Sequence, residues 1–293
     1  MSHASEEIAS QPVCWASAGE LAGAVADDLP RRGERIAVVG CGTSYNVAKS
    51  YAALREASGG GLSDAMAASE VRWGRHYDRF VFVSRSGTTS EVIDAARRVP
   101  HGVQRVALVA DGRSPLAQSV ATSVVLDFAH ERSVVQTRFA TSVLALLRAH
   151  LGEDMRPLVA AGRAAVHVPL DASWLSAQRF VFLGSGWTIG LADEAALKLR
   201  EGAQLWTESY PAMELRHGPI SVLDHDALVW SFGPAPHGLA AEVAATGARF
   251  VTSDLDPLAD LVRAQRLALA LAEARHLDLD HPRHLSFSVV LAH

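Results

Sequence analysis

The segment RIAVVGCGTSYNVAKSYAALRE (residues 35–56) shares its plan with RFVFLGSGWTIGLADEAALKLRE (residues 179–201), and these two stretches decide the fold class. In each, a short apolar run leads into a glycine-containing turn, and small or apolar residues then recur at helical spacing. The runs IAVVG and FVFLG are continuously apolar, as is typical of strands that a parallel sheet buries on both faces. The turns begin at Gly40 and Gly184, 144 residues apart (184 − 40). This repeat predicts two similar α/β units in tandem.

Further segments of both halves alternate between strand and helix patterns. Strands are expected at the start of 80–99, where a helix follows, and within 105–111, 123–128, 227–234 and 249–254. Long helices are expected over 134–151 and 257–274. Such alternation favours a doubly wound parallel sheet flanked by helices. We expect an N-terminal helical segment (1–28), a first domain (29–152), a helical connector (153–172) and a second domain with a C-terminal tail (173–293).

The composition is that of a globular protein, with 49% hydrophobic and 20% charged residues and a formal net charge of −5. This charge argues against nucleic-acid binding. No apolar run reaches the roughly 18 residues that span a bilayer, and the polar, acidic N-terminal stretch is unlike a signal peptide. The two cysteines, Cys14 and Cys41, exclude a disulfide framework and a cysteine-rich metal site. We therefore expect a cytoplasmic protein that binds neither nucleic acid nor a membrane.

A hydroxyl-rich loop, SRSGTTS at residues 84–90, follows one predicted strand and opens a helix at Glu91. Ligands of open parallel sheets bind at the carboxyl ends of strands, where helix N-termini present free backbone N–H groups. Hydroxyl donors beside such a helix end predict a phosphate site. Arg85 either adds positive charge there or points to solvent. The alternative is an ordinary helix cap, for which one hydroxyl suffices.

The first glycine turn, Gly40-Cys41-Gly42, matches neither common nucleotide-binding loop. The third glycine of a dinucleotide fingerprint is absent, because Tyr45 stands at that position, and no Gly-Lys-Ser/Thr sequence follows. The sequence therefore predicts no nicotinamide cofactor and no nucleotide-binding P-loop.

Charged residues share one face of the helix predicted in 179–201. Glu194, Lys198 and Glu201 are spaced by four and three residues, which places them together. The alternative is that these charges form an ion pair in solvent and have no functional role. The rest of this helix is apolar and small, however, so we expect it to be buried, and buried charges need partners or a task.

Two histidine clusters are candidates for acid–base chemistry. His217 stands beside Glu214 in the segment 209–219, which we interpret as a loop bounded by prolines, and an imidazole titrates in the neutral range. His281 and His284 flank Pro282-Arg283 near the C-terminus.

Six motifs occur in a specific order over nearly the whole chain: GCGTSYNVAKSY, ASEVRW, SRSGTTSEV, ERSVVQTRFATS, EAALKLREG and ESYPAMELRHGP. Together they resemble the sugar isomerase (SIS) domain family, in particular the isomerase half of glucosamine-6-phosphate synthase and its relatives without a glutaminase domain. Those relatives include amino-sugar-phosphate isomerase/deaminases and fructosamine-6-phosphate deglycases. The resemblance implies two tandem SIS domains, each a flavodoxin-like three-layer sandwich. Position 2 is Ser rather than a nucleophilic Cys, so no glutaminase activity is expected.

The resemblance also implies roles for individual residues. Glu201 matches the carboxylate that moves a proton between C1 and C2 of the sugar, and Lys198 supports it. His217 matches the ring-opening histidine, which in the family reaches across the interface of a homodimer with a shared active site. The positions that match the sugar 6-phosphate site are Ser44, Ser84, Arg85, Ser86 and Thr89, with Arg85 standing where the family often has Gln. Further substrate contacts are implied for Gly42, Thr43, Glu194 and Gln136, the last standing where the synthase has a hydroxyl.

One departure lies in the C-terminal tail. Phe287 stands where the synthase carries a lysine used in ring opening and imine formation, so a Schiff base between tail and substrate is excluded. Aldose–ketose isomerisation needs only Glu201 as base and a ring opener, so it is still expected, and water can attack an imine formed within the substrate itself. The expected function is an isomerase acting on an amino-sugar or ketose 6-phosphate, with or without release of ammonia or an amine. The alternative is a phosphosugar-binding sensor without catalysis. No metal or organic cofactor is implied.

Overall fold

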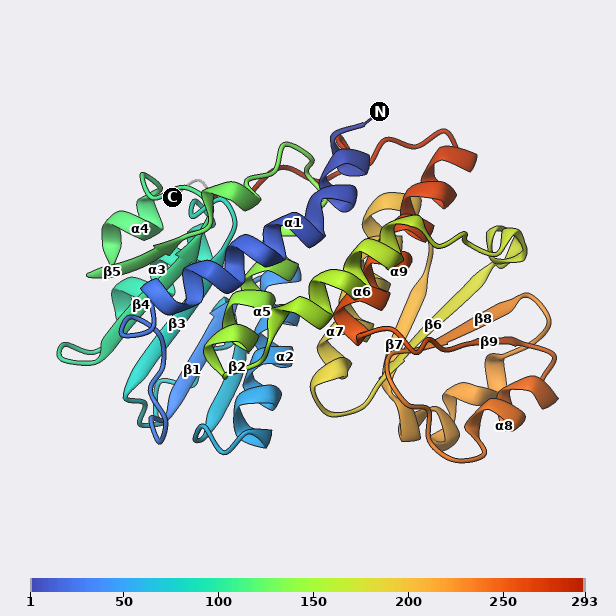
Figure 1. The fold of residues 1–293 in the computed structure, drawn as a ribbon, viewed down its shortest axis with the longest axis horizontal. Helices are drawn as coiled ribbons and strands as arrows, with labels where there is room; N and C mark the ends of the chain where they lie inside the picture. The colour runs from blue at the N-terminus through green and yellow to red at the C-terminus, as the bar shows by residue number, and fades with distance from the viewer. Residues whose placement is uncertain (1, 292–293) are drawn as a thin grey trace.

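The computed structural model describes residues 2–291 and has an α/β fold with two parallel sheets flanked by helices (Figure 1). The first sheet has the order β2-β1-β3-β4-β5, with strands β1 Ile36–Gly40, β2 Ser63–Ala67, β3 Arg79–Ser84, β4 Gln104–Val109 and β5 Thr122–Val125. The second has the order β7-β6-β8-β9, with β6 Arg179–Gly184, β7 Thr207–Pro211, β8 Ala227–Ser231 and β9 Arg249–Val251. All strand pairs are parallel.

The central strands are buried on both faces, as their continuous apolar runs predict. Alternate residues of β1 point to opposite sides: Val38 joins the core shared with the second half, and Val39 packs under the outer helices. The edge strands β2 and β7 escaped the sequence analysis, and the interpretation of 209–219 as a loop throughout was wrong at its start. Their sequences, SDAMA and TESYP, mix polar and apolar residues because an edge strand is half solvated.

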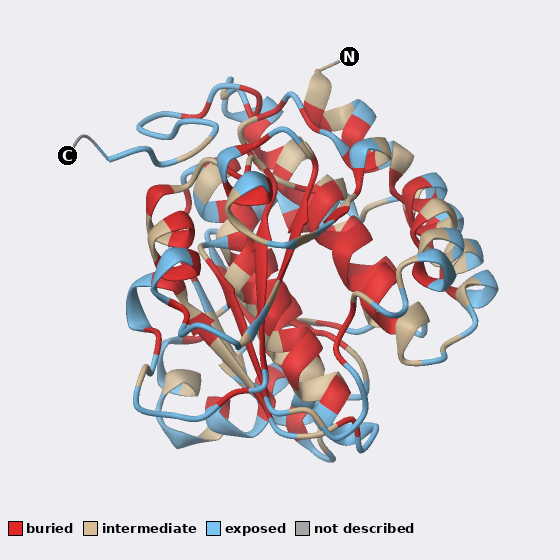
Figure 2. Ribbon diagram, turned by 90° about the vertical axis from the view of Figure 1, so that its left-hand side faces the viewer, coloured by how far each residue is buried: buried red, intermediate tan, exposed pale blue. Residues whose placement is uncertain are grey.

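Helices cover both faces of the sheets, and Figure 2 shows buried residues along the strands and along parts of the helices. The helices are α1 His3–Ala24, α2 Thr43–Ala57, α3 Ser90–Arg98, α4 Pro115–Ser119, α5 Arg138–His150, α6 Met155–His167, α7 Ile189–Ala203, α8 Leu239–Ala245 and α9 Pro257–Ala274. The helix predicted over 134–151 begins at Arg138, since Glu131 Oε1 accepts hydrogen bonds from the backbone N–H groups of Thr137 and Arg138 there. Within residues 2–291, no helix combines the length and apolarity needed to cross a membrane.

The two halves meet where α2 of the first packs on α7 of the second. Gly190 makes this close approach possible: a Cβ there would lie 2.3 Å from Ser50 Oγ and 2.4 Å from the backbone oxygen of Asn46. One apolar cluster runs through this contact and includes side chains of both sheets, among them Val38 and Phe182. The two sheets therefore share a core.

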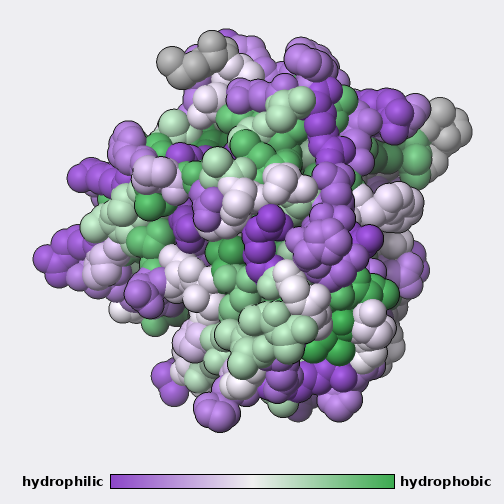
Figure 3. Space-filling view, turned by 90° about the vertical axis from the view of Figure 1, so that its right-hand side faces the viewer, coloured by the Kyte–Doolittle hydropathy of each residue, from purple (hydrophilic) through white to green (hydrophobic). Residues whose placement is uncertain are grey.

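The outer face of the second half is covered by α8, beside the edge that β9 forms. Figure 3 shows this face as a mixture of polar residues and a pale apolar area in its lower part. The exposed side of α8 is alanine-rich, with Ala240, Ala241 and Ala244 in solvent, whereas Leu239 and Val243 point inward.

Candidate functional site

A cavity of about 170 Å³ lies at the carboxyl ends of β1 and β3, between the first glycine turn and the hydroxyl loop (residues 84–90). This is the edge at which open parallel sheets bind ligands. The predicted site residues that line the cavity are Gly42, Thr43, Ser44, Ser84, Arg85, Ser86, Thr89, Gln136 and Glu201. The structure thus brings most of the predicted set together.

The hydroxyl loop is held in shape by its own side chains. Ser84 Oγ accepts a hydrogen bond from the Gly87 N–H at 3.1 Å, and Ser86 Oγ accepts one from the Thr88 N–H at 3.2 Å. Gly87 has φ +61°, and a Cβ there would lie 2.1 Å from Ser114 Oγ, so the turn requires glycine. Thr89 is the N-cap residue of α3, yet its side chain makes no capping hydrogen bond. The ordinary-cap explanation of this loop therefore fails at the cap position.

Two buried polar atoms of residues that line the cavity have no hydrogen-bond partner among the described residues: Arg85 Nε, a donor, and Gln136 Oε1, an acceptor. Buried polar groups are nearly always paired in folded proteins. A donor and an acceptor left unpaired beside the same cavity indicate a place where a polar ligand binds.

The remaining nitrogens of Arg85 are occupied by protein atoms. Its Nη1 donates to the Ser133 carbonyl at 2.8 Å and lies 3.5 Å from the Glu131 carboxylate. Its Nη2 donates to the carbonyls of Val134, at 3.1 Å, and Phe287, at 2.9 Å. Burial lowers the pKa of this guanidinium, and Glu131 opposes that change. The alternative of a solvent-facing Arg85 is wrong, because 3% of the residue is exposed.

The charged face of α7 forms a buried network behind the cavity. Lys198 Nζ lies 2.6 Å from Glu201 Oε2 and 3.3 Å from Glu194 Oε1. Burial lowers the pKa of Lys198, but the two carboxylates more than offset this, so its pKa lies above the usual value. Burial raises the pKa of Glu194, and Lys198 opposes that shift. The alternative of an ion pair in solvent is therefore wrong, because the Lys198 side chain is buried, with 1% of its surface exposed.

Side chains of α2 complete this network from the other half. Thr43 Oγ1 lies 2.9 Å from Lys198 Nζ and 3.1 Å from Glu194 Oε1, and Asn46 Nδ2 donates to Glu194 Oε2 at 3.0 Å. Asn46 was missed by the sequence analysis. Its position three residues after Thr43, on the same helix face, is the signal that could have found it.

Glu201 differs from Glu194 in reaching solvent, with 22% of its side chain exposed. It lines the first cavity and also a second one, of about 410 Å³, together with Trp206, Arg283 and Leu285. One carboxylate oxygen of Glu201 is held by Lys198. A carboxylate that is fixed by an ammonium group and exposed to a cavity is suited to take and return a proton.

His217 lies outside both cavities. It is exposed at the end of the short 3-10 helix Ala212–His217, which follows β7. Within one chain the structure does not bring it to Glu201. His281 is exposed as well, with Nδ1 3.2 Å from Asp278, whereas His284 lines the second cavity.

The C-terminal tail (residues 285–291) lies along the hydroxyl loop, and residues 285–289 line the first cavity. The Phe287 ring lies over the Arg85 guanidinium, 3.9 Å from its centroid to Cζ. Thr88 Oγ1 donates to Ser288 Oγ at 2.8 Å, and the Ser90 N–H donates to the Val289 carbonyl at 3.1 Å. From the sequence, Phe287 is interpreted only as the replacement of a lysine, whereas in the structure its ring covers Arg85 beside the cavity.

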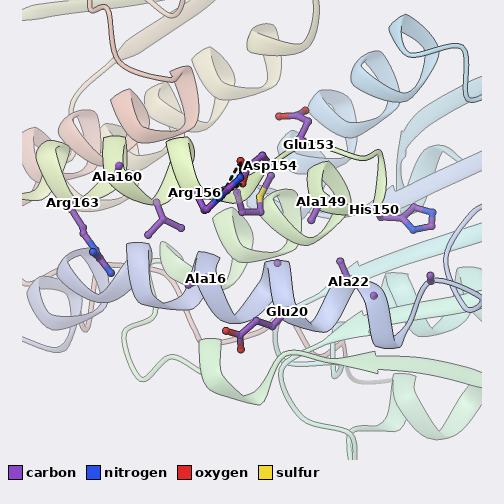
Figure 4. Close-up of a pocket in the computed structure, with 15 residues that line it drawn as sticks. Ala16, Glu20, Ala22, Ala149, His150, Glu153, Asp154, Arg156, Ala160 and Arg163 are labelled. Atoms are coloured by element: carbon purple, nitrogen blue, oxygen red, sulfur yellow. Dashed lines mark hydrogen bonds and ion pairs between the residues drawn. The ribbon is translucent and has the colours of Figure 1, made fainter.

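Another cavity, of about 720 Å³, lies between α1 and α6 and contains none of the predicted residues. Figure 4 shows small side chains such as Ala16 and Ala160 along it, with Glu20 and an Asp154–Arg156 ion pair at its edge. These groups offer no catalytic arrangement. Across residues 2–291, no group of three or more His, Cys, Asp or Glu side chains could hold a metal ion.

No protein-family model matches the chain, but comparisons with individual proteins find relatives. Glutamine–fructose-6-phosphate aminotransferase (isomerizing) 1 of Arabidopsis thaliana is 27% identical over 92% of this chain and 49% of that protein. The chain spans about half the length of several curated relatives that it matches. Glucosamine-6-phosphate deaminase from Thermotoga maritima superimposes with a TM-score of 0.82 at 22% identity, covering 99% of this chain and 100% of that one.

Tagatose-6-phosphate ketose/aldose isomerase from Escherichia coli superimposes with a TM-score of 0.80 at 20% identity, covering 100% of this chain and 97% of that one. At such identities these structures establish the fold. Together with the aminotransferase relatives, they confirm the resemblance to the sugar isomerase family that the motifs predict.

Proposed function

We propose that this relative of the aminotransferases' isomerase part is a phosphosugar isomerase acting on an amino-sugar or ketose 6-phosphate, with or without release of ammonia or an amine. The observation that carries the proposal is the position of Glu201. It shares one cavity with the hydroxyl loop, and a buried ammonium group fixes its carboxylate. An anion site and a general base beside the same small cavity are what such a reaction requires.

The 6-phosphate is proposed to bind the hydroxyl loop at the N-terminus of α3. Ser44 and Thr89 have side-chain hydroxyls without hydrogen bonds to other described residues, and Arg85 Nε is an unpaired donor. Ser84 and Ser86 shape the loop, and the helix end adds a favourable field for an anion. Gln136 Oε1 is left to accept from a sugar hydroxyl.

Proton transfer is proposed to pass through Glu201. Its carboxylate removes the proton from C2 of the open-chain aldose, the C–H electron pair forms a C1–C2 double bond, and the C1 carbonyl oxygen takes a proton. Return of a proton to C1, with loss of the proton on the C2 oxygen or nitrogen, gives a ketose or a ketose imine. Water can hydrolyse the imine to release ammonia or an amine. Lys198 and Glu194 hold the carboxylate in place.

Ring opening is proposed for His217 of a second copy of the chain. His217 is exposed and lines neither cavity of its own chain, which fits a residue that acts across a homodimer interface. We also propose that the two sheets with their helices are tandem SIS domains, over 29–152 and 173–293, that each is a flavodoxin-like sandwich, and that the protein is cytoplasmic.

A phosphosugar-binding sensor is the second candidate, and the tail favours it. Phe287 supplies no acid–base group, and residues 285–289 of the tail form part of the cavity wall. Against a pure binder stands the buried network of Glu194, Lys198 and Glu201, which phosphate binding does not require.

Incubation with glucosamine 6-phosphate in deuterated water, followed by NMR, tests the proposal. Deuterium at C1 or C2, or accumulation of fructose 6-phosphate, supports proton transfer, and a parallel rise of ammonia identifies deamination. If that sugar is inert, a fructosamine 6-phosphate and tagatose 6-phosphate are tested in the same way. Saturable binding of these sugars without exchange in any of them contradicts the isomerase and supports the sensor.

A further inference from the structure

Arg85 joins the hydroxyl loop to two other parts of the chain. Through Nη1 and Nη2 it bonds the carbonyls of Ser133 and Val134, and through Nη2 it also bonds the carbonyl of Phe287. The Phe287 ring covers the same guanidinium at 3.9 Å. A cation–π contact and a charged hydrogen bond thus fasten one tail residue to one buried arginine.

Glu131 restrains the guanidinium of Arg85. It is fully buried, and Oε1 accepts from the backbone N–H groups of Thr137 and Arg138 at 2.6 and 2.7 Å, while Oε2 lies 3.5 Å from Arg85 Nη1. Because Glu131 is anchored at the start of α5, a swing of the guanidinium toward the phosphate site would leave this buried carboxylate without its cation.

The first cavity is small when the tail makes these contacts with Arg85. At about 170 Å³ it lies below the roughly 300–1,000 Å³ that is usual for small-molecule sites. Residues 285–289 form part of its wall, so this segment limits the space left for a hexose phosphate.

We propose that Arg85 is a positioning residue that latches the C-terminal tail over the site and couples closure of the tail to occupation of the phosphate site through its unpaired Nε. This rests on the proposed function only for the identity of the ligand. With phosphate bound to Nε, the guanidinium is held in the orientation that bonds the Phe287 carbonyl. With Arg85 removed, the tail loses both contacts and opens, while the hydroxyls still bind phosphate.

Cleavage by chymotrypsin tests the latch, because the protease must take the Phe287 ring into its own specificity pocket. Intact mass spectrometry follows loss of the six residues after Phe287 (293 − 287). In the ligand-free protein, Arg85→Gln is expected to accelerate this cleavage about tenfold, since a charged hydrogen bond and a cation–π contact are lost. Arg85→Lys keeps the positive charge but lacks the planar guanidinium, so its cleavage rate is expected to lie between those of wild type and Arg85→Gln. It replaces Arg85→Gln in the test if that variant does not fold. Arg113→Gln, at an exposed arginine paired with Asp111, is the control.

Glucosamine 6-phosphate tests the coupling. It is expected to slow cleavage of the wild-type tail severalfold and to leave the Arg85→Gln rate unchanged, while KM rises more than kcat falls. Equal ligand-free rates in wild type and Arg85→Gln overturn the latch. Protection of the variant to the same degree as wild type, or no protection of a wild type that binds the sugar, overturns the coupling. A wild type that binds no phosphosugar contradicts the proposed function and the coupling, whereas the ligand-free comparison still decides the latch.

Discussion

The electrostatic centre of the site is one ammonium group between two carboxylates. Lys198 neutralises part of the charge of Glu194 and Glu201, and Thr43 and Asn46 supply the remaining hydrogen bonds to Glu194. Because Glu194 and Lys198 are fully buried, neither can exchange its partner for water. The network therefore fixes Glu201, the member that reaches the cavity.

Replacement of Lys198 by Met is expected to destabilise the protein by about 3–5 kcal/mol, because it leaves a buried carboxylate without its cation. The other lysine of the chain provides the control. Lys49 pairs with Asp193 at a half-exposed position, so Lys49→Met is expected to cost at most about 1 kcal/mol. Urea unfolding of both variants measures the difference, and equal losses would contradict the buried-charge account.

Titration of the Glu7 carboxyl is expected to make the free energy of unfolding depend on pH. Burial raises the pKa of this carboxyl, and Oε2 has no hydrogen-bond partner among the described residues. A raised folded-state pKa gives stability that is present below the unfolded pKa and is lost as pH rises through the folded value. Glu7→Gln removes that loss, while its Oε1 can still accept from the backbone of Arg132. The variant is therefore expected to gain stability relative to wild type as pH rises from about 4 to 7.

Unfolding titrations at several pH values measure this difference. A stability difference that is constant across that range, or that shrinks as pH rises, would show that Glu7 does not titrate with a raised pKa.

At the scale of elements, the contact between α2 and α7 aligns the two halves of the site. Thr43 and Asn46 come from α2, and the three charged residues come from α7. The helices approach closely because Gly190 has no side chain. Any group added at that position separates the helices and pulls the network apart.

Gly190→Ala is therefore expected to destabilise the protein by about 1–3 kcal/mol and to lower activity, since its Cβ meets Ser50 Oγ and a backbone oxygen. Gly23→Ala is the matched control, because Gly23 also lies in a helix and a Cβ there meets nothing within 4 Å. That control is expected to be neutral or slightly stabilising. Similar stabilities of the two variants would contradict close packing at Gly190.

What the sequence predicts correctly at this scale depends on local patterns. The apolar runs of β1 and β6 and the helix over 257–274 are apparent from neighbouring residues, and α9 has those predicted bounds. The edge strands β2 and β7 mix polar and apolar residues and carry no such run. The partners of Arg85 were also inaccessible, because Glu131 and Phe287 lie 46 and 202 residues away in the chain. The local sequence identifies the hydroxyl loop, but it does not show which distant residues Arg85 contacts.

On the scale of the whole molecule, the inner faces of the two sheets share one apolar cluster, although each outer face has a cluster of its own. The cluster that contains Val38 of β1 also contains Phe182 of β6, and it continues through α1, α5 and α9. Residues from the start and the end of the chain meet as well, since Asp280 accepts hydrogen bonds from the backbone N–H groups of His3 and Ala4 at 2.8 Å. Neither half can unfold without exposing apolar surface of the other.

Unfolding by heat or urea is accordingly expected to follow a single cooperative transition, with coincident curves from tryptophan fluorescence and far-ultraviolet circular dichroism. Calorimetric and van't Hoff enthalpies are expected to agree. Two resolved transitions, each with its own midpoint, would show that the halves are energetically independent.

The central claim is that Glu201 moves the proton, and a comparison of Glu201→Gln with Glu208→Gln tests it most directly. Glu208 is an exposed carboxylate on β7 that lines neither the first nor the second cavity. For whichever phosphosugar the wild type turns over, NMR in deuterated water measures exchange at C1 and C2, and calorimetric titration measures binding. The account predicts that Glu201→Gln loses exchange by about 10²-fold or more while binding changes only a few-fold, and that Glu208→Gln resembles wild type. Wild-type exchange in Glu201→Gln would contradict it.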